Sequence, residues 1–389
     1  MSLLKRVPFI VLTIALILVV SVWPRPGITN SGQASVAWLS AQEAKVTDGF
    51  ARVTAPGPLE FPRDLGPHND YQTEWWYYTG NLATNSGRDF GYQLTFFRRA
   101  LTPETEPVRE ASAWRSNQVY FSHFTISDIE NQKFYPHERF SRQSAGLSGA
   151  QAAPYRVWLE NWSATEIAPG QVHLVADADD VALDLILEET LPPLLQGDRG
   201  YNKKGPEPGN ASYYYSIVQQ KSQGTVTVAD DSFAVNGLTW KDHEYSTRAL
   251  GPGIVGWDWF SLQLEDGSAL MLYSLRQETG DIAEMSSGTY MSADGQPQTI
   301  DQTDWQIDVL DTWRSPTSQA SYPSQWHIEI PKLDLVLDGK SLMANQELTV
   351  STTYWEGAVG FAGTVAGHPV EAKGYVEMAG YTERLDAVL

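Results

Sequence analysis

The chain has 389 residues, a formal net charge of -20, no cysteine and 12% aromatic residues. The missing cysteine excludes disulfides, zinc–thiolate sites, iron–sulfur clusters and cysteine nucleophiles. A surface this acidic repels nucleic acid and anionic membrane surfaces, so we expect neither as a partner. The length is sufficient for two domains of ordinary size.

The first segment of the chain is typical of export. Lys5 and Arg6 precede an apolar run over residues 7–23, and prolines and small residues follow it. This pattern predicts a signal peptide over residues 1–37. The apolar run is also close to the length of a bilayer span, so an uncleaved anchor that tethers the protein to a membrane stays open. In both cases we expect an extracytoplasmic protein, in the periplasm or cell envelope or secreted.

After this leader the pattern is that of β-structure. Alternating or aromatic-rich runs recur between turn residues, and amphipathic helical patterns are scarce. Many short strands closed by tight turns are typical of barrels and sandwiches, which protect the edges of their sheets. Clear predicted strands are Glu74–Leu82, Phe90–Arg98, Gln118–Asp128, Ser212–Val218, Trp259–Leu264 and Leu270–Arg276.

One hairpin pattern occurs twice. Trp75–Leu82 leads through a glycine-containing turn into a second strand, and Trp257–Leu264 does the same. Two similar hairpins so far apart predict two related β-domains, over residues 38–236 and 237–389. A chance similarity between two aromatic-rich hairpins is the alternative.

The segment Trp240–Tyr245 combines a histidine, carboxylates and aromatic rings. On a strand, Asp242 and Glu244 share one face while His243 and Tyr245 share the other, so the acidic pair and the imidazole cannot chelate one metal ion together. We therefore expect no metal. His243 and Tyr245 could face a pocket, with Asp242 and Glu244 in support. Alternatively, His243 is a hydrogen-bonded structural residue at a domain junction.

Two carboxylates stand beside tryptophans. Asp258 lies between Trp257 and Trp259, and Glu74 lies two residues before Trp76. A carboxyl group that faces an apolar cavity has a raised pKa and can act as an acid near neutral pH. The alternative is a solvent-facing carboxylate on a strand whose tryptophans belong to the core.

The other motifs give little information about function. His123 could line a barrel interior or simply be packed, and His68, His137, His173, His327 and His368 belong to no recognisable constellation. The chain has no G-x-S-x-G, H-E-x-x-H or P-loop motif. Gly251–Gly256 formally fits G-x-G-x-x-G, but it leads into an aromatic strand pattern rather than a helix, so we reject a dinucleotide site.

Several motifs together resemble the AttH/CrtC-type family. This family includes hydroxyneurosporene synthase, also called carotenoid 1,2-hydratase, and many secreted proteins described only as predicted hydrolases. The resemblance covers roughly residues 50–389. The segments that carry it are Thr73–Gly80, His123–Asp128, Trp240–Ser246, Gly256–Phe260, Tyr354–Val359 and Gly374–Glu377.

The resemblance implies two tandem lipocalin-like β-domains, in agreement with the repeated hairpin. It also implies functional roles for His243, for Tyr245, where the family usually has tryptophan, and for Asp258. Hydration of a C=C bond needs an acid that protonates one carbon and a surface that stabilises the resulting cation. Aromatic faces can supply about 2 kcal/mol each to such a cation when desolvated. Neither a metal nor an organic cofactor is required.

These observations predict an exported all-β protein that binds an isoprenoid or lipid-like molecule. We expect a cofactor-independent hydratase in which Asp258 is the acid and His243 and Tyr245 assist, all three converging on one cavity. Two alternatives stay open. One is a non-catalytic binder of apolar molecules that accompanies an ABC-type transport system of the envelope, and the other is a hydrolase.

Overall fold

The structure is a computed structural model that describes residues 48–103 and 116–383. Within this part the regular structure consists of β-strands and three short 3-10 helices, so the all-β prediction is confirmed. The predicted leader, residues 1–37, lies outside the described residues. No helix in the described part of the chain has the length and apolarity needed to cross a membrane.

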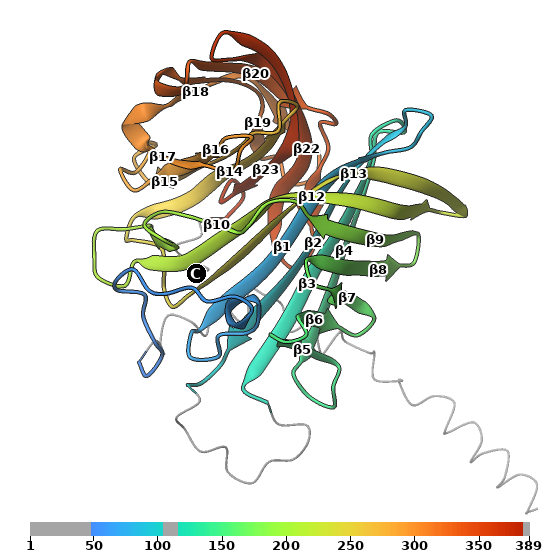
Figure 1. The fold of residues 1–389 in the computed structure, drawn as a ribbon, viewed down its shortest axis with the longest axis vertical. Helices are drawn as coiled ribbons and strands as arrows, with labels where there is room; N and C mark the ends of the chain where they lie inside the picture. Colours follow the sequence, from blue (N-terminus) through green and yellow to red (C-terminus); the bar gives the residue numbers. More distant parts are fainter. Residues whose placement is uncertain (1–47, 104–115, 384–389) are drawn as a thin grey trace, which may run out of the picture. The chain divides into compact units, whose positions relative to one another are not determined.

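Sheet A contains the first thirteen strands, all antiparallel to their neighbours (Figure 1). Its order is β4-β3-β2-β1-β13-β12-β9-β8-β7-β6-β5, and the short strands β10 and β11 also pair with β12. The strands are β1 Thr73–Ala83, β2 Asp89–Ala100, β3 Gln118–Asp128, β4 Lys133–Arg142, β5 Ser148–Gln151, β6 Arg156–Leu159, β7 Trp162–Ala168, β8 Gln171–Ala178, β9 Val181–Glu189, β10 Leu194–Leu195, β11 Tyr201–Lys203, β12 Ala211–Val228 and β13 Asp231–Ser246, preceded by the 3-10 helix η1 Arg63–Leu65.

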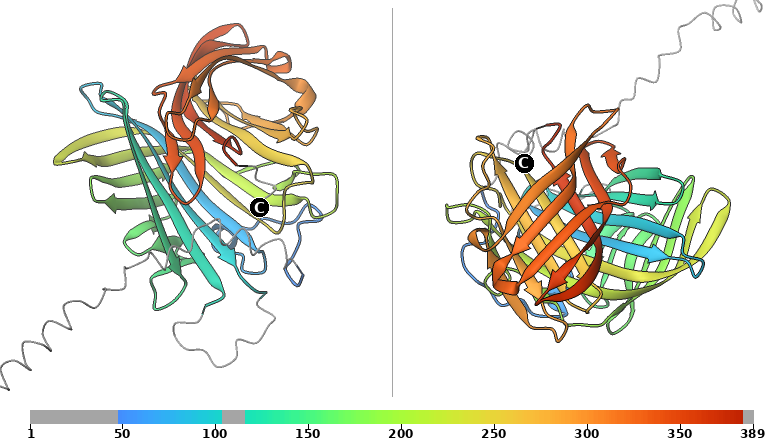
Figure 2. Two further views of the ribbon diagram at one scale, coloured as in Figure 1. Left: turned by 180° about the vertical axis from the view of Figure 1, so that it is seen from behind. Right: turned by 90° about the horizontal axis from the view of Figure 1, so that it is seen from above.

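Sheet B contains the last ten strands, in the order β17-β16-β15-β14-β23-β22-β20-β19-β18, with β21 also paired to β22. Figure 2 shows these yellow-to-red strands curving around a common interior. They are β14 Ile254–Leu264, β15 Ala269–Gln277, β16 Ser287–Met291, β17 Pro297–Asp301, β18 Gln306–Arg314, β19 Ser321–Ile330, β20 Leu335–Ser341, β21 Glu347–Thr349, β22 Thr353–Val365 and β23 His368–Ala379, with the 3-10 helices η2 Gln302–Asp304 and η3 Pro331–Leu333.

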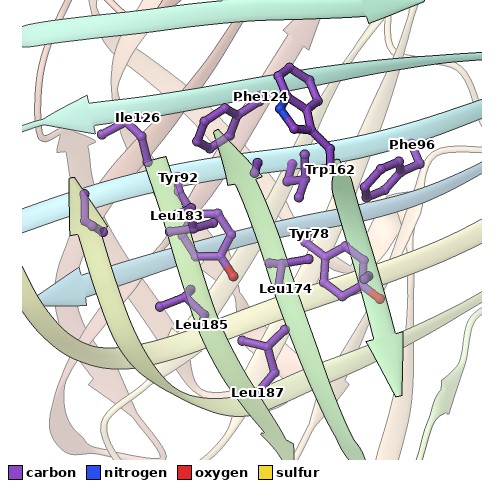
Figure 3. Packing of buried hydrophobic residues seen from close by; sticks show 14 of the residues in the cluster. Tyr78, Tyr92, Phe96, Phe124, Ile126, Trp162, Leu174, Leu183, Leu185 and Leu187 are labelled. Carbon is purple, nitrogen blue, oxygen red and sulfur yellow. The ribbon is translucent and has the colours of Figure 1, made fainter. Parts of the chain in front are cut away.

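Sheet A curls so that β5–β9 lie opposite β1–β4 (Figure 1). Phe124 on β3 packs edge-on against Trp162 on β7, with ring centroids 5.5 Å apart. Figure 3 shows the interior between these walls, where Tyr78 and Phe96 face leucines such as Leu174. Because alternate residues of each strand point inward, the concave face of the sheet is a continuous buried core.

The convex side of sheet A packs on sheet B. Tyr77 and Trp240 from sheet A meet Trp259 from sheet B in one buried cluster, and the Tyr77 hydroxyl donates to Glu356 over 2.6 Å. The described residues all belong to one compact unit. The predicted division between residues 236 and 237 falls inside β13, and the chain passes from sheet A to sheet B between Ser246 and Ile254.

Candidate active site

The candidate site lies on the concave face of sheet A, where three neighbouring strands carry polar side chains. The antiparallel register sets Trp76 of β1 beside His243 of β13, and His243 beside Tyr215 of β12. One register row further along, Glu74 of β1 lies between Arg98 of β2 and Tyr245 of β13. Residues that are far apart in sequence thus form adjacent rows on one surface.

The segment before β1 adds two more residues to this surface. Trp76 donates its indole N–H to the carbonyl of Leu65, 3.0 Å away, which fixes η1 against the end of the sheet. This contact brings Asp64 and His68 over the polar rows. The His68 ring stacks on Tyr245 with centroids 3.6 Å apart and planes 8° from parallel.

A chain of hydrogen bonds connects these groups. His68 bonds to Asp64 through Nε2 and to Glu74 Oε1 through Nδ1, each over 2.8 Å. The same Glu74 oxygen lies 2.8 Å from His243 Nε2. On its other side, His243 Nδ1 lies 2.9 Å from the hydroxyl of Tyr215. The chain therefore runs from a carboxylate at one end to a phenol at the other.

The Glu74 carboxylate is saturated with donors. Its second oxygen accepts from Arg98 Nε over 2.7 Å and from the backbone N–H of His68 over 2.9 Å. Glu74 and Arg98 are both fully buried. Because an ionised carboxylate can only accept, His243 Nε2 donates to Glu74, and in the neutral imidazole Nδ1 is left to accept from the Tyr215 hydroxyl.

The two imidazoles have pKa values displaced in opposite directions. Burial lowers the pKa of His243 to about 4, despite its bond to Glu74. Burial also opposes charge on His68, but hydrogen bonds to Asp64 and Glu74 outweigh it and raise the pKa above its ordinary value. Burial disfavours the Glu74 anion as well, yet Arg98 and the two imidazoles hold its pKa well below the usual range. Near neutral pH the site thus combines an ionised Glu74 with a neutral His243, while the hydrogen bonds of both His68 ring nitrogens to carboxylates favour the protonated form of His68.

Strand alternation around His243 is as predicted. Asp242 points away from His243 to the convex side, where it accepts from Tyr214 over 2.6 Å and from Trp240 over 2.7 Å. Glu244, on the same side, pairs with Lys204 at 2.9 Å. Neither carboxylate contacts the imidazole, so their predicted support of His243 would have to act through the backbone.

Asp258 is not part of this surface. It shares a face of β14 with the buried Phe260, on the concave side of sheet B. Its carboxylate accepts from Arg276 Nε over 3.2 Å and from the Tyr381 hydroxyl over 3.1 Å. Burial raises its pKa and Arg276 opposes that rise. The expectation that Asp258 meets His243 in one cavity is therefore corrected, because β13 and β14 belong to different sheets.

Three of the sequence-predicted supporting residues, Trp257, Trp259 and His123, fall on the contact between the sheets. Trp259 donates to the Tyr214 hydroxyl over 3.1 Å, and Trp257 packs in the same cluster. His123 bonds to the hydroxyl of Tyr354 at 2.7 Å. It therefore faces sheet B rather than the barrel interior. Among the supporting residues, Glu74 and Trp76 do lie at the site.

The donor atoms of His68, Glu74 and His243 lie within 4.8 Å of one another, close enough to hold a metal ion. A metal ion would have to replace the hydrogen bonds that join them. The Arg98 guanidinium already balances the Glu74 charge, which opposes a further cation at this point. The arrangement suits proton transfer better than metal binding.

Sequence reasoning missed five residues of this surface: Asp64, His68, Arg98, Tyr215 and Lys241, the last of which lies on the same face of β13 as His243. One signal was available, since Lys241 shares the inward face with His243 and Tyr245 by alternation. The positions of His68 and Tyr215 depend on a loop and on strand pairing, which no local pattern encodes.

A curled antiparallel sheet around a buried carboxylate–imidazole–phenol chain defines a β-barrel protein with acid–base groups inside. A profile described as AttH-like matches residues 52–381. The chain belongs to the AttH-like family, so the AttH-type resemblance is confirmed.

The solved structures agree with this assignment. A putative AttH from Nitrosomonas europaea is 32% identical, with a TM-score of 0.75 over 85% of this chain and 100% of that one. A kievitone hydratase from Nectria haematococca shares the fold at a TM-score of 0.65 over 86% of this chain and 98% of that one, at 16% identity.

Two curated relatives are named as enzymes. The dehydratase asqC of Emericella nidulans is 28% identical over 51% of this chain and 58% of its own length. The kievitone hydratase of Fusarium solani subsp. phaseoli is 24% identical over 54% of this chain and 59% of its own length. The matches thus span less than two thirds of each relative.

Proposed function

We propose that this protein is a cofactor-independent hydro-lyase that adds water to, or removes it from, a C=C bond inside sheet A. The observation that carries the proposal is the Glu74–His243–Tyr215 chain, with its neutral imidazole between an anion and a phenol. The names of the two curated relatives, a dehydratase and a hydratase, support the same reaction class.

Each residue of the Glu74–His243–Tyr215 hydrogen-bond chain has a distinct task in this reaction. The Tyr215 oxygen faces the substrate and takes or gives the proton that moves. His243 Nδ1 accepts the Tyr215 proton in the same step, and Glu74 stabilises the imidazolium that forms. The Arg98 cation and the hydrogen bond from His68 keep Glu74 ionised. The proton returns along the same path, so no net charge accumulates over the cycle.

The substrate should be largely apolar. The interior of sheet A around this hydrogen-bond chain is built from aromatic and aliphatic side chains, among them Trp76, Tyr78 and Phe96. Such walls exclude water other than the reacting molecule. An isoprenoid or lipid-like compound matches these walls.

The experiment is incubation of the purified protein with isoprenoid, phenolic and lipid extracts, followed by mass spectrometry for gain or loss of one water. We expect conversion by the wild type and at least a hundredfold loss in Glu74→Gln, His243→Gln and Tyr215→Phe. His327→Gln changes a partly exposed histidine of sheet B that pairs with Asp338 and Glu329, and serves as the control.

Two results would contradict the proposal. One is wild-type turnover by Tyr215→Phe. The other is no turnover of any compound together with a lipid that co-purifies, which would favour the non-catalytic binder.

Location outside the cytoplasm is a further part of this proposal, and it rests on the leader pattern of residues 1–37. Cell fractionation with N-terminal sequencing of the mature protein would distinguish a cleaved signal from an anchor. Co-purification of a transport ATPase from detergent-solubilised envelopes would test the proposed ABC-type partner.

A further inference from the structure

Lys241 is a buried lysine on the same inward face as His243. It lies two residues before His243 on β13, between Tyr78 of β1 and Ile217 of β12 in register. Two strand residues span about 7 Å, so the ammonium group and the imidazole emerge close together from one surface. The Lys241 residue is 1% exposed.

The surroundings of Lys241 are aromatic. Its Nζ lies 4.2 Å from the ring centroid of Tyr155, 5.6 Å from that of Tyr78 and 5.9 Å from that of Tyr215. The hydroxyls of Tyr78 and Tyr155 bond to each other over 2.7 Å. Within residues 48–103 and 116–383, the lysine takes part in cation–π contacts but in no hydrogen bond or ion pair.

Lys204 provides a contrast within the same molecule. It also lies over tyrosine rings, those of Tyr214 and Tyr273, but it pairs with Glu244 at 2.9 Å. This carboxylate outweighs burial and raises the pKa of Lys204. Burial instead lowers the pKa of Lys241 to about 8, with Glu189 and Glu166 opposing from beyond hydrogen-bond distance.

An ammonium group removed from water without an acceptor is costly to the folded protein. A ligand that brings an electron-rich oxygen to this point recovers that cost. Because Lys241 adjoins His243 and Tyr215, the oxygen would belong to the reacting part of the substrate. A carbonyl oxygen conjugated to the reacting carbons fits this position, since it gains negative charge during the reaction.

We propose that Lys241 binds the carbonyl oxygen of the substrate, so that the hydro-lyase acts on β-hydroxycarbonyl compounds and their α,β-unsaturated products. This inference rests on the proposed function and gives it a substrate class. Lys241 touches the substrate and stabilises the enolate oxygen, while Tyr215 and His243 move the proton.

The reaction balances without any added reagent. The Tyr215–His243 pair takes a proton from the carbon next to the carbonyl, and the C–H electrons form an enolate whose oxygen lies against Lys241. The enolate collapses to a C=C bond and expels hydroxide from the β-carbon. The hydroxide takes up the abstracted proton and leaves as water. Hydration is the reverse sequence.

The test uses two probes with one carbon skeleton, the enone 4-phenylbut-3-en-2-one and the alcohol 4-phenylbut-3-en-2-ol. Binding is measured by calorimetry, and the ultraviolet spectrum of the bound enone reports on its carbonyl. We expect the wild type to bind the enone at least tenfold more tightly than the alcohol and to shift its absorption to longer wavelength. Lys241→Met should lose both the preference and the shift.

Lys221→Met is the matched control, because Lys221 is an exposed lysine on neighbouring β12. It should bind both probes as the wild type does. Should Lys241→Met fail to fold, the wild type alone decides: its enone preference must fall as the pH rises through about 8, where Lys241 loses its charge. The titratable groups that face Lys241 are His243 on its own strand, the tyrosines Tyr78, Tyr155 and Tyr215, and the carboxylates Glu189 and Glu166. Burial raises the pKa values of the three tyrosines and of Glu189, and Lys241 opposes the rise at Glu189.

Equal binding of the two probes by the wild type overturns the inference, and so does an undiminished preference in Lys241→Met. The proposed function fails separately. A Lys241-dependent spectral shift without turnover of any compound supports carbonyl binding by Lys241 and contradicts the proposed hydro-lyase function. The converse result is hydration of an isolated alkene at a rate that depends on His243 and is unchanged in Lys241→Met. That result supports the hydro-lyase function and contradicts carbonyl binding by Lys241.

Discussion

The two sheets share a strand order but differ in what their concave faces carry. In each sheet the opening strand lies between the second strand and the last one, β1 between β2 and β13 and β14 between β15 and β23. The repeated hairpin identified in the sequence is therefore the opening pair of each sheet. The two sheets are therefore related in the order of their strands.

Corresponding positions show the difference. If Trp75 matches Trp257, then Glu74 matches Gly256 and Trp76 matches Asp258. The last strand completes the contrast, because the residue paired with Trp76 is His243, whereas the residue paired with Asp258 is Met378. Sheet B thus keeps the strand order and lacks the acid–base chain, which means that the fold alone does not make the site.

The strongest test of this contrast is removal of the Glu74 carboxylate. Glu74→Ala leaves Arg98 buried without its partner, and we expect a loss of about 3–5 kcal/mol in the free energy of unfolding. Urea unfolding followed by tryptophan fluorescence measures it. A loss below about 1 kcal/mol would mean that the Glu74–Arg98 pair does not organise sheet A.

The contact between the sheets should respond to pH. Glu356 is fully buried, one of its oxygens has no hydrogen-bond partner among the described residues, and Glu377 is its register neighbour. Burial, reinforced by Glu377, raises the pKa of Glu356 well above 4.5. The folded state therefore binds this proton more tightly than the unfolded state, and stability falls as the pH rises above about 4.5.

The expected slope is about 1.4 kcal/mol per pH unit for one such proton. Glu356→Gln keeps an acceptor for the Tyr77 hydroxyl and carries no charge, so it should flatten the decline. Unfolding curves between pH 4.5 and 8 for both proteins make the comparison. Parallel curves would show that Glu356 is not the responsible group.

Asp258→Asn tests whether sheet B takes part in the reaction. We expect less than a threefold change in turnover, because Asp258 contacts Arg276 and Tyr381 rather than the His243 chain. The partly exposed ion pair with Arg276 contributes about 1 kcal/mol or less to stability. Loss of turnover in a folded Asp258→Asn protein would break the contrast between the sheets.

The smallest effect is expected when Tyr245 loses only its hydroxyl. Its ring stacks on His68, whereas its hydroxyl makes no hydrogen bond within the described residues. Tyr245→Phe should therefore change stability by less than about 0.5 kcal/mol and leave turnover near the wild-type rate. Tyr245→Ala, which removes the buried ring together with the stack, should cost about 3–5 kcal/mol. A large loss in the Phe variant would assign the hydroxyl a chemical role.

Much of the site could be read from local patterns. Alternation correctly separated His243 and Tyr245 from Asp242 and Glu244, and the aromatic context drew attention to Glu74. The family resemblance grouped Asp258 with His243 and Tyr245. The structure separates them, because the chain changes sheets between β13 and β14.

The sequence by itself determined the β-class, the family and the face on which each strand residue lies, because period-two alternation is a local property of an extended chain. Only the tertiary structure decided which strands are neighbours. Glu74 and His243 are 169 residues apart and meet through the β1–β13 register. Such pairing depends on how the whole sheet closes around its core, so the acid–base chain exists only once sheet A has formed.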